Sequence, residues 1–160
     1  GDKGELFKTH TRSGMIVTSG PISRTFVHNF LVVGDAAGQV KPTTGGGVIL
    51  GGICAAIAGK IAAEAVEKGS ADCKFLSSYE TLWRRKLERE FRLTRLARKV
   101  ANRLSDKTVD KIFKSIIDSN LQGELSIFGD MDFQADSILR LLRKGDFLRA
   151  IFSSLSDIIK

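Results

Sequence analysis

The sequence predicts an α+β protein that is mostly α-helical. Three observations support this fold class. Phe30–Val33 is the clearest strand-like run, a glycine-rich loop and a long stretch of small apolar residues follow it, and the chain after about residue 72 shows only helical periodicity. We therefore expect two parts, residues 1–70 with a few strands and a buried helix, and residues 71–160 as a helical domain.

Composition and charge are those of a folded protein with a basic excess. Of the 160 residues, 42% are hydrophobic and 27% charged, and the formal net charge is +7. Most of the excess lies after residue 71, where basic and acidic residues alternate at helical spacing and few aromatic residues are interleaved. This pattern is typical of solvated helix faces, so we do not expect a nucleic-acid partner.

The two cysteines, Cys54 and Cys73, form no CxxC motif, and no histidine stands at metal-ligand spacing from them. We expect neither a disulfide framework nor a metal site. Reduced cysteines suit a cytoplasmic protein.

The first part of the chain contains three extended segments. Met15–Thr18 is β-branched and predicts a strand, Gly20-Pro21 interrupts it, and Ile22–Val27 is a weaker extended segment. After the turn residues His28-Asn29, the continuous apolar run Phe30–Val33 predicts a strand covered on both faces.

A buried helix is expected after the glycine loop, ending near Lys68 with Gly69 as its C-cap signal. Its first part is uncharged over Pro42–Gly59, the length of a membrane span, but its many glycines and the charged Lys60 favour a buried helix. Small residues spaced four apart form one face that allows a backbone or a cofactor to approach closely. They are Gly47, Gly51, Ala55, Gly59 and Ala63.

The second part predicts four helices. Cys73–Leu104 has apolar residues near a 3.6-residue period, and Ser105 or Asp106 caps a second helix that ends near Asn120. Ala135–Arg143 and Phe147–Ile159 complete the set. The bulky residues expected in the core of this part include Trp83, Phe91 and Phe113.

Two common phosphate-binding motifs are absent from the glycine region. A P-loop would need Ser or Thr after Gly59-Lys60, where Ile61 stands, and a dinucleotide fingerprint starting at Gly45 would need glycine where Leu50 stands.

A different motif fits the same residues. A hydrophobic strand ends in Gly34-Asp35-Ala36-Ala37, followed by Pro42 and Gly45-Gly46-Gly47. This arrangement resembles the second flavin-contacting motif of the FAD-dependent, hydroxylase-like flavoprotein superfamily. More narrowly, residues 20–56 resemble the geranylgeranyl reductase family, whose archaeal members, digeranylgeranylglycerophospholipid reductases among them, saturate isoprenoid chains of membrane lipids or their precursors. The resemblance extends over about Gly14–Gly69.

The resemblance implies that residues 1–70 are the C-terminal segment of a FAD-binding domain and residues 71–160 a helical C-terminal domain. It also implies roles for the residues of the motif. Asp35 would accept a hydrogen bond from a ribityl hydroxyl of FAD, with Gly34 and Ala36 beside it. Pro42 would shape the loop. The pyrimidine edge of the flavin would lie near Gly45, Gly46 and Gly47 and the amides of Val48 and Ile49.

The reaction implied is the reduction of FAD by an external donor, NAD(P)H or a ferredoxin-like protein, followed by hydride transfer to an alkene of a prenyl lipid. A proton donor is also required. We considered His10, His28, Tyr79 and Cys54 and assign a catalytic role to none of them, because each is a lone residue in the sequence.

The family's pyrophosphate-binding glycine motif lies ahead of a substrate-binding sheet, and neither is present in these 160 residues. We therefore expect the chain to be a fragment that lacks the N-terminal FAD-binding portion and is inactive alone. Its basic helices would suit peripheral contact with the cytoplasmic face of a membrane. Two alternatives remain, a part of another flavoprotein such as a monooxygenase or halogenase, and a basic helical binding module for anionic lipid or nucleic acid.

Overall fold

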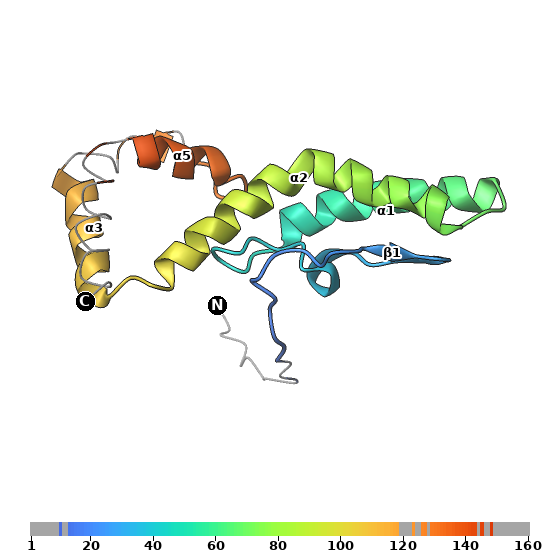
Figure 1. Ribbon diagram of the computed structural model, residues 1–160, viewed down its shortest axis with the longest axis horizontal. Coiled ribbons are helices and arrows are strands. Elements are labelled where there is room, and N and C mark those ends of the chain that lie inside the picture. The colour runs from blue at the N-terminus through green and yellow to red at the C-terminus, as the bar shows by residue number, and fades with distance from the viewer. Residues whose placement is uncertain are drawn as a thin grey trace, which may run out of the picture.

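The computed structural model describes His10 and residues 13–118, 123, 126–127, 129–143, 145 and 148. Within them the protein is mostly helical with a very small sheet, which confirms the predicted fold class (Figure 1). The elements in chain order are β1 (Phe26–Val27), β2 (Phe30–Leu31), the 3-10 turn η1 (Gly34–Ala37), α1 (Val48–Glu67), α2 (Cys73–Ala101), α3 (Asp106–Asp118) and α5 (Ala135–Arg143).

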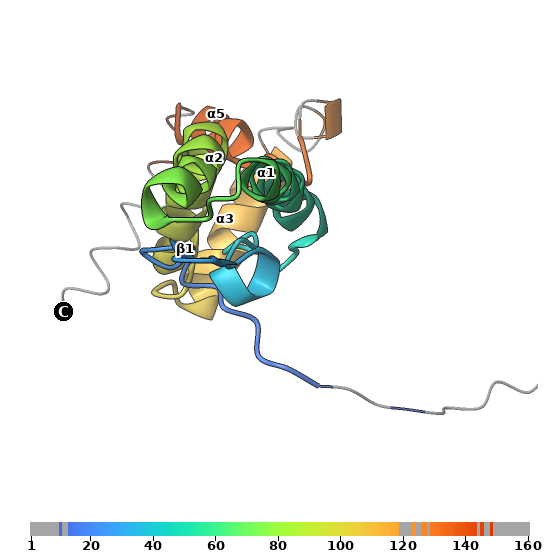
Figure 2. The same cartoon turned by 90° about the vertical axis from the view of Figure 1, so that its right-hand side faces the viewer.

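Helices α1 and α2 lie side by side, with the β1–β2 hairpin and η1 beneath them (Figure 2). The core forms where their apolar faces meet. Within it the rings of Trp83 and Phe91 pack edge to face, with centroids 5.9 Å apart. The core residues are Leu50, Cys54, Ala58, Ile61 and Ala65 of α1 and Leu76, Tyr79, Trp83, Leu87 and Phe91 of α2.

The turn between α1 and α2 is built from local signals. Gly69 adopts a left-handed conformation with φ +63°, which ends α1 as the sequence predicts. The Asp72 carboxylate then accepts a hydrogen bond of 2.7 Å from the amide of Phe75 and so caps α2. The predicted domain boundary near residue 70 falls in this turn, and the division into two domains stays a prediction.

The strands are shorter than predicted. β1 and β2 pair antiparallel through Phe26 with Leu31 and Val27 with Phe30, around a turn in which Asn29 has φ 59°. Phe30 is 59% exposed, so the expectation of a four-residue strand covered on both faces is wrong for the described residues. The reason is that the core lies on one face of the hairpin, where Leu31 packs, and Phe30 points to the other face, which the described structure leaves open.

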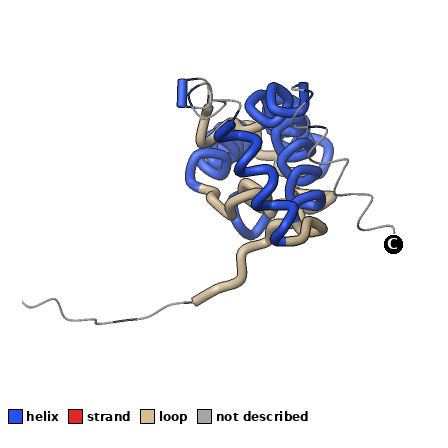
Figure 3. The backbone as a smooth tube through the Cα atoms, turned by 90° about the vertical axis from the view of Figure 1, so that its left-hand side faces the viewer, coloured by secondary structure: helices blue, strands red, loops and turns tan. Residues whose placement is uncertain are grey.

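The strand predicted over Met15–Thr18 is also wrong. These residues form extended coil with no ladder, and the Met15 side chain is 95% exposed. The segment leads away from the helices toward the N-terminus (Figure 3). β-branched composition favours a strand only where a pairing edge is available, and the described structure offers none here.

The helix predictions fared better. α2, α3 and α5 follow the predicted ranges closely, and α5 packs along the middle of α2. Trp83 and Phe91 are buried, but Phe113 is 61% exposed, so its expected place in the core is wrong. It lies on α3, beyond the C-terminal end of α2 and away from the α1–α2 core (Figure 1). The predicted helix Phe147–Ile159 lies almost entirely outside the described residues.

Helix α1 is apolar on its exposed side as well as its buried side over most of its length. By length and composition alone it could cross a membrane, although core helices meet the same criteria. Of the small-residue stripe, Gly51 is buried against the α-carbon of Gly34, whereas Ala55, Gly59 and Ala63 are exposed. The side of α1 that packs is therefore offset from the predicted stripe, and it carries Leu50, Gly51, Cys54, Ala58, Ile61 and Ala65.

Candidate functional site

The fold brings Asp35 against the beginning of α1. A β-carbon placed on Gly47, the N-cap residue of α1, would lie 2.7 Å from Oδ1 of Asp35 and 2.8 Å from Cγ1 of Val40. Only glycine leaves room for the carboxylate in this position. The two halves of the predicted motif, the acidic turn and the glycine loop, thus meet at one point.

The N-terminus of α1 is open at this point. Among the described residues no side chain caps the helix, and Val48 and Ile49 are 88% and 45% exposed. Amides of a helix's first turn have no intrahelical acceptor, and the helix dipole makes this end positive. Free backbone donors and a carboxylate acceptor therefore lie side by side, facing solvent.

The loop before α1 closes tightly on itself. The amide of Gly45 donates to the carbonyl of Lys41 at 2.7 Å, and the amide of Lys41 donates to the carbonyl of Gly46 at 2.9 Å. Gly45 has φ +77°, and a β-carbon on Gly46 would meet Cε of Lys41 at 2.9 Å. Pro42 is fully buried under the loop.

A buried polar network supports the acidic turn from below. The amide of Gly34 donates to Oε1 of Gln39 at 2.9 Å, and Nε2 of Gln39 donates to the Tyr79 hydroxyl at 2.9 Å. That hydroxyl lies 3.1 Å from the carbonyl of Val32, to which it donates. Gln39 and Tyr79 are both fully buried, so α2 and the end of the strand together fix the backbone that carries Asp35.

The predicted site residues thus fall into two groups. Asp35, Ala36, Gly46, Val48 and Ile49 are exposed around the start of α1, while Gly34, Gly45 and Gly47 are half-buried and Pro42 is buried. The exposed residues offer hydrogen-bonding groups to a ligand. The half-buried and buried residues set the conformation of the backbone that carries those groups.

Sequence reasoning missed the supporting residues Gln39, Lys41 and Thr43. Gln39 stands in the loop beside Gly38, which has φ +67°. A β-carbon on Gly38 would meet the carbonyl oxygen of Gly20 at 2.6 Å. Polar residues in a loop are usually exposed, so the sequence did not suggest that Gln39 is buried. The neighbouring Gly38 was the one local sign of a tight turn at this point.

The side chains considered as proton donors are either exposed histidines or residues packed in the core. His10 and His28 are exposed, the latter in the hairpin turn. Burial raises the pKa of the Cys54 thiol to about 12. Burial likewise raises the pKa of Tyr79 to about 12, against the opposing effect of its hydrogen bond with Gln39. Both groups hold their protons firmly near neutral pH, and both pack in the core. In the described part of the chain no three acidic, histidine or cysteine side chains gather as a metal site.

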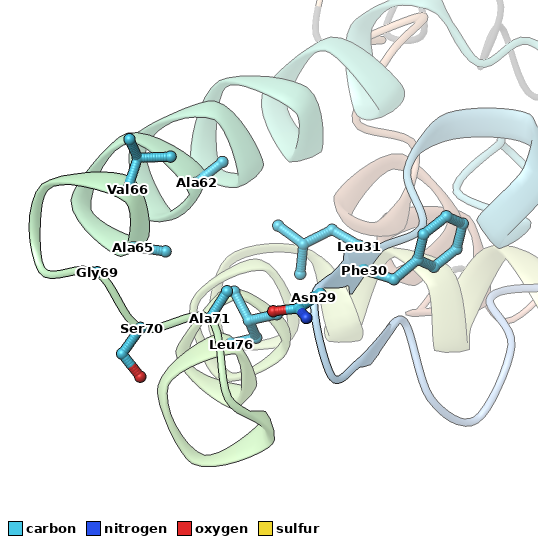
Figure 4. A pocket seen from close by; sticks show the side chains of 10 residues that line it. All are labelled: Asn29, Phe30, Leu31, Ala62, Ala65, Val66, Gly69, Ser70, Ala71 and Leu76. Carbon is cyan, nitrogen blue, oxygen red and sulfur yellow. The ribbon is translucent and has the colours of Figure 1, made fainter.

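A separate apolar pocket lies near the other end of α1. It has a volume of about 460 Å³ and lies between the hairpin and the last turns of α1 (Figure 4). Phe30 and Leu31 line one side, and Ala62, Ala65 and Val66 line the other. α1 rises about 30 Å over its length, so the helical wall of this pocket lies at the opposite end of α1 from Gly47.

Curated relatives share most of this chain. It is 42% identical over 131 residues to digeranylgeranylglycerophospholipid reductase 2 of Methanothermobacter thermautotrophicus, a match that covers 82% of this chain and 32% of that protein. It is 38% identical over 102 residues to digeranylgeranylglycerophospholipid reductase of Methanocaldococcus jannaschii, covering 63% and 26% respectively. The chain spans about a third or less of the length of these relatives.

A solved structure shares the fold. A geranylgeranyl bacteriochlorophyll reductase-like protein from Thermoplasma acidophilum superposes with a TM-score of 0.60 at 21% identity, covering 90% of this chain and 32% of that one. No protein-family model matches the chain. These relatives, which are named as reductases, confirm the resemblance to the geranylgeranyl reductases that the central motif predicts.

Proposed function

We propose that this chain, which resembles the digeranylgeranylglycerophospholipid reductases over most of its length, forms the ring-and-ribityl side of a FAD site in a prenyl reductase. The observation that supports this most directly is the contact between Asp35 and Gly47. It places a carboxylate acceptor beside the uncapped N-terminus of α1, and both are exposed to a ligand.

The donors and acceptors present fit a flavin. The Asp35 carboxylate would bind a ribityl hydroxyl, as a strong acceptor for a sugar-like group. The amides of Val48 and Ile49, at the positive end of α1, would stabilise negative charge at the pyrimidine edge. When bound, FAD would supply the hydride for alkene reduction. The chain's own contribution is to orient the ring and stabilise its charge.

The remaining part of such a reductase would cover the exposed apolar face of this chain. Val48 and Val66 at the two ends of α1 and Phe30 of the hairpin are 88%, 81% and 59% exposed. The curated relatives are about two and a half times as long as this chain, and we propose that it corresponds to their C-terminal part. The missing N-terminal portion would supply the pyrophosphate loop and pack on α1 and on the apolar pocket of Figure 4.

Substitution of Asp35 in the complete protein tests the FAD site. Asp35→Asn replaces the charged acceptor with a neutral amide, and we expect FAD to bind about ten- to a hundredfold more weakly. Flavin fluorescence titration measures this. Asp136→Asn, which removes an exposed carboxylate on α5, is the control and should leave the affinity unchanged. Unchanged binding by Asp35→Asn contradicts the proposed site.

The isolated 160-residue chain gives a second test. It holds one side of the proposed site, so we expect it to retain no FAD after purification and to show no reductase activity. A chain that purifies yellow with stoichiometric FAD would contradict this.

We propose a prenyl lipid as substrate and NAD(P)H or a ferredoxin-like protein as electron donor. Saturation of a geranylgeranyl lipid by the complete protein, followed by mass spectrometry with each donor in turn, tests both. Consumption of oxygen with no saturated product would instead favour the monooxygenase alternative.

Peripheral membrane contact would use the basic face of α2. Arg84 and Arg89 are engaged, Arg84 with Glu80 and Glu88 and Arg89 with Asp136, so they are poor probes of a lipid surface. Arg85 and Lys86 are exposed beside them. We propose a cytoplasmic enzyme that contacts the membrane peripherally. Charge reversal at Arg85 and Lys86 should then reduce its pelleting with anionic liposomes. Unchanged pelleting would oppose the membrane proposal, and salt-sensitive DNA binding would support the binding-module alternative.

A further inference from the structure

The glycine loop is tied to a segment about 90 residues later in the chain. The Lys41 ammonium donates to the Asp132 carboxylate and to the carbonyl of Met131, both at 2.8 Å. The Lys41 side chain is 12% exposed and that of Asp132 39%. Because the stem of Lys41 passes across Gly46, this ion pair holds the side chain that covers the loop.

A second pair of contacts fixes the next residues of the loop. The hydroxyl of Thr43 donates to Oε1 of Gln134, and the guanidinium of Arg98 donates to the carbonyl of Thr43 at 2.9 Å. Thr43 is thereby held from α2 and from the start of α5. We call the Lys41–Asp132 and Thr43–Gln134 contacts the loop anchor.

The segment that provides the loop anchor is itself held rigidly. Oδ1 of Asp130 accepts hydrogen bonds from the amides of Asp132 at 2.7 Å and Phe133 at 3.0 Å. The carboxylate of Glu90 on α2, 6% exposed, accepts from the amides of Gln134 at 2.7 Å and Ala135 at 3.1 Å. The N-terminus of α5 is therefore pinned to α2 by a buried carboxylate, and Asp132 and Gln134 occupy defined positions.

We propose that Asp132 and Gln134 are positioning residues that preorganise the Lys41–Gly47 loop for its ligand. They act through Lys41 and Thr43, and the resemblance to known reductases assigns them no role. The proposal rests on the proposed FAD site. A ligand that binds a preformed loop avoids the cost of ordering it, so loss of the loop anchor lowers affinity without removing any ligand contact.

The test uses Asp132→Asn in the complete protein, with two readouts. We expect FAD to bind about five- to tenfold more weakly, a smaller effect than that of Asp35→Asn because no contact with the ligand is removed. We also expect the amides of Lys41 and Gly45, which close the loop, to exchange with deuterium faster by a similar factor in the free protein. Asp132→Glu keeps the charge, so its FAD affinity and its amide exchange rates should lie between those of Asp132→Asn and the wild type. Gln134→Ala should likewise weaken FAD binding and speed the exchange of these two amides.

Asp136→Asn is the matched control. Its carboxylate pairs with Arg89 of α2 in the same region, at 2.6 Å, rather than with the loop. Both readouts should stay at the wild-type value in this variant.

The outcomes separate this proposal from the proposed function. If Asp35→Asn weakens FAD binding and Asp132→Asn does not, the positioning role is wrong and the site stands. Equal effects of Asp132→Asn and Asp136→Asn, or faster exchange throughout the protein with unchanged FAD affinity, would show a structural role only and overturn the proposal. If the wild type binds no FAD, the proposed function fails. Amide exchange at Lys41 and Gly45 then decides whether Asp132 orders the loop.

Discussion

The carboxylate of Asp35 rests against Gly47, so closely that a β-carbon on Gly47 would lie 2.7 Å from Oδ1. This contact makes the acidic turn and the start of α1 one unit. A side chain at position 47 would therefore displace Asp35 or Val40, whose Cγ1 would lie 2.8 Å from the same β-carbon.

Gly47→Ala should therefore displace Asp35. We expect a loss of FAD affinity of at least about tenfold in the complete protein and a destabilisation of about 1–3 kcal/mol from overpacking. Titration with FAD and urea unfolding measure the two effects. Gly52→Ala is the control, since a β-carbon there meets nothing within 4 Å, and alanine in a helix should raise stability by about 0.5–1 kcal/mol. Wild-type FAD affinity in Gly47→Ala would contradict the close contact.

Tyr79→Phe should destabilise the acidic turn. It removes the hydroxyl that meets Gln39 and Val32, leaving a buried amide without its partner, at a cost of about 1–3 kcal/mol. Urea unfolding of this chain measures the change. Ser77→Ala, an exposed hydroxyl on the same helix, should change stability by less than about 0.5 kcal/mol. Equal stabilities of the two variants would show that the network contributes little.

Stability should decline at alkaline pH through the buried Cys54. Burial raises its pKa from 9.0 to about 12 in the folded protein. The unfolded chain therefore releases this proton first, so the stability it contributes is complete below pH 9 and is lost as pH rises toward 12. Tyr79, raised from 10.0 to about 12, adds to the same decline. Cys54→Ala should flatten the pH dependence of the urea midpoint between pH 9 and 12.

Glu80 should contribute stability that is lost in acid. Burial alone would raise the pKa of its carboxyl, but hydrogen bonds from the amide and hydroxyl of Thr25, together with Arg84, lower it below 4.5. A lowered pKa gives stability that is present above pH 4.5 and lost as the pH falls through the folded-state value. Unfolding midpoints from pH 6 to 3 should therefore fall less steeply in Glu80→Gln.

Much of the helical architecture could be predicted from the sequence, because its signals are local. Asp72 caps α2, Gly69 ends α1, and the 3.6-residue period of α2 places Trp83 and Phe91 on its buried face. Each of these signals extends over a few turns of chain. The strand expected at Met15–Thr18 failed for the converse reason, since strand formation requires a partner that local composition does not specify.

The candidate site divides in the same way. The sequence by itself determined the motif, with Asp35 after the strand and Gly45–Gly47 before the helix, because backbone freedom and charge belong to the residues themselves. Tertiary structure alone decided what supports that motif. The Gln39–Tyr79 bond spans 40 residues and the Lys41–Asp132 pair spans 91. Contacts at such separations depend on the path of the whole chain, which local pattern does not encode.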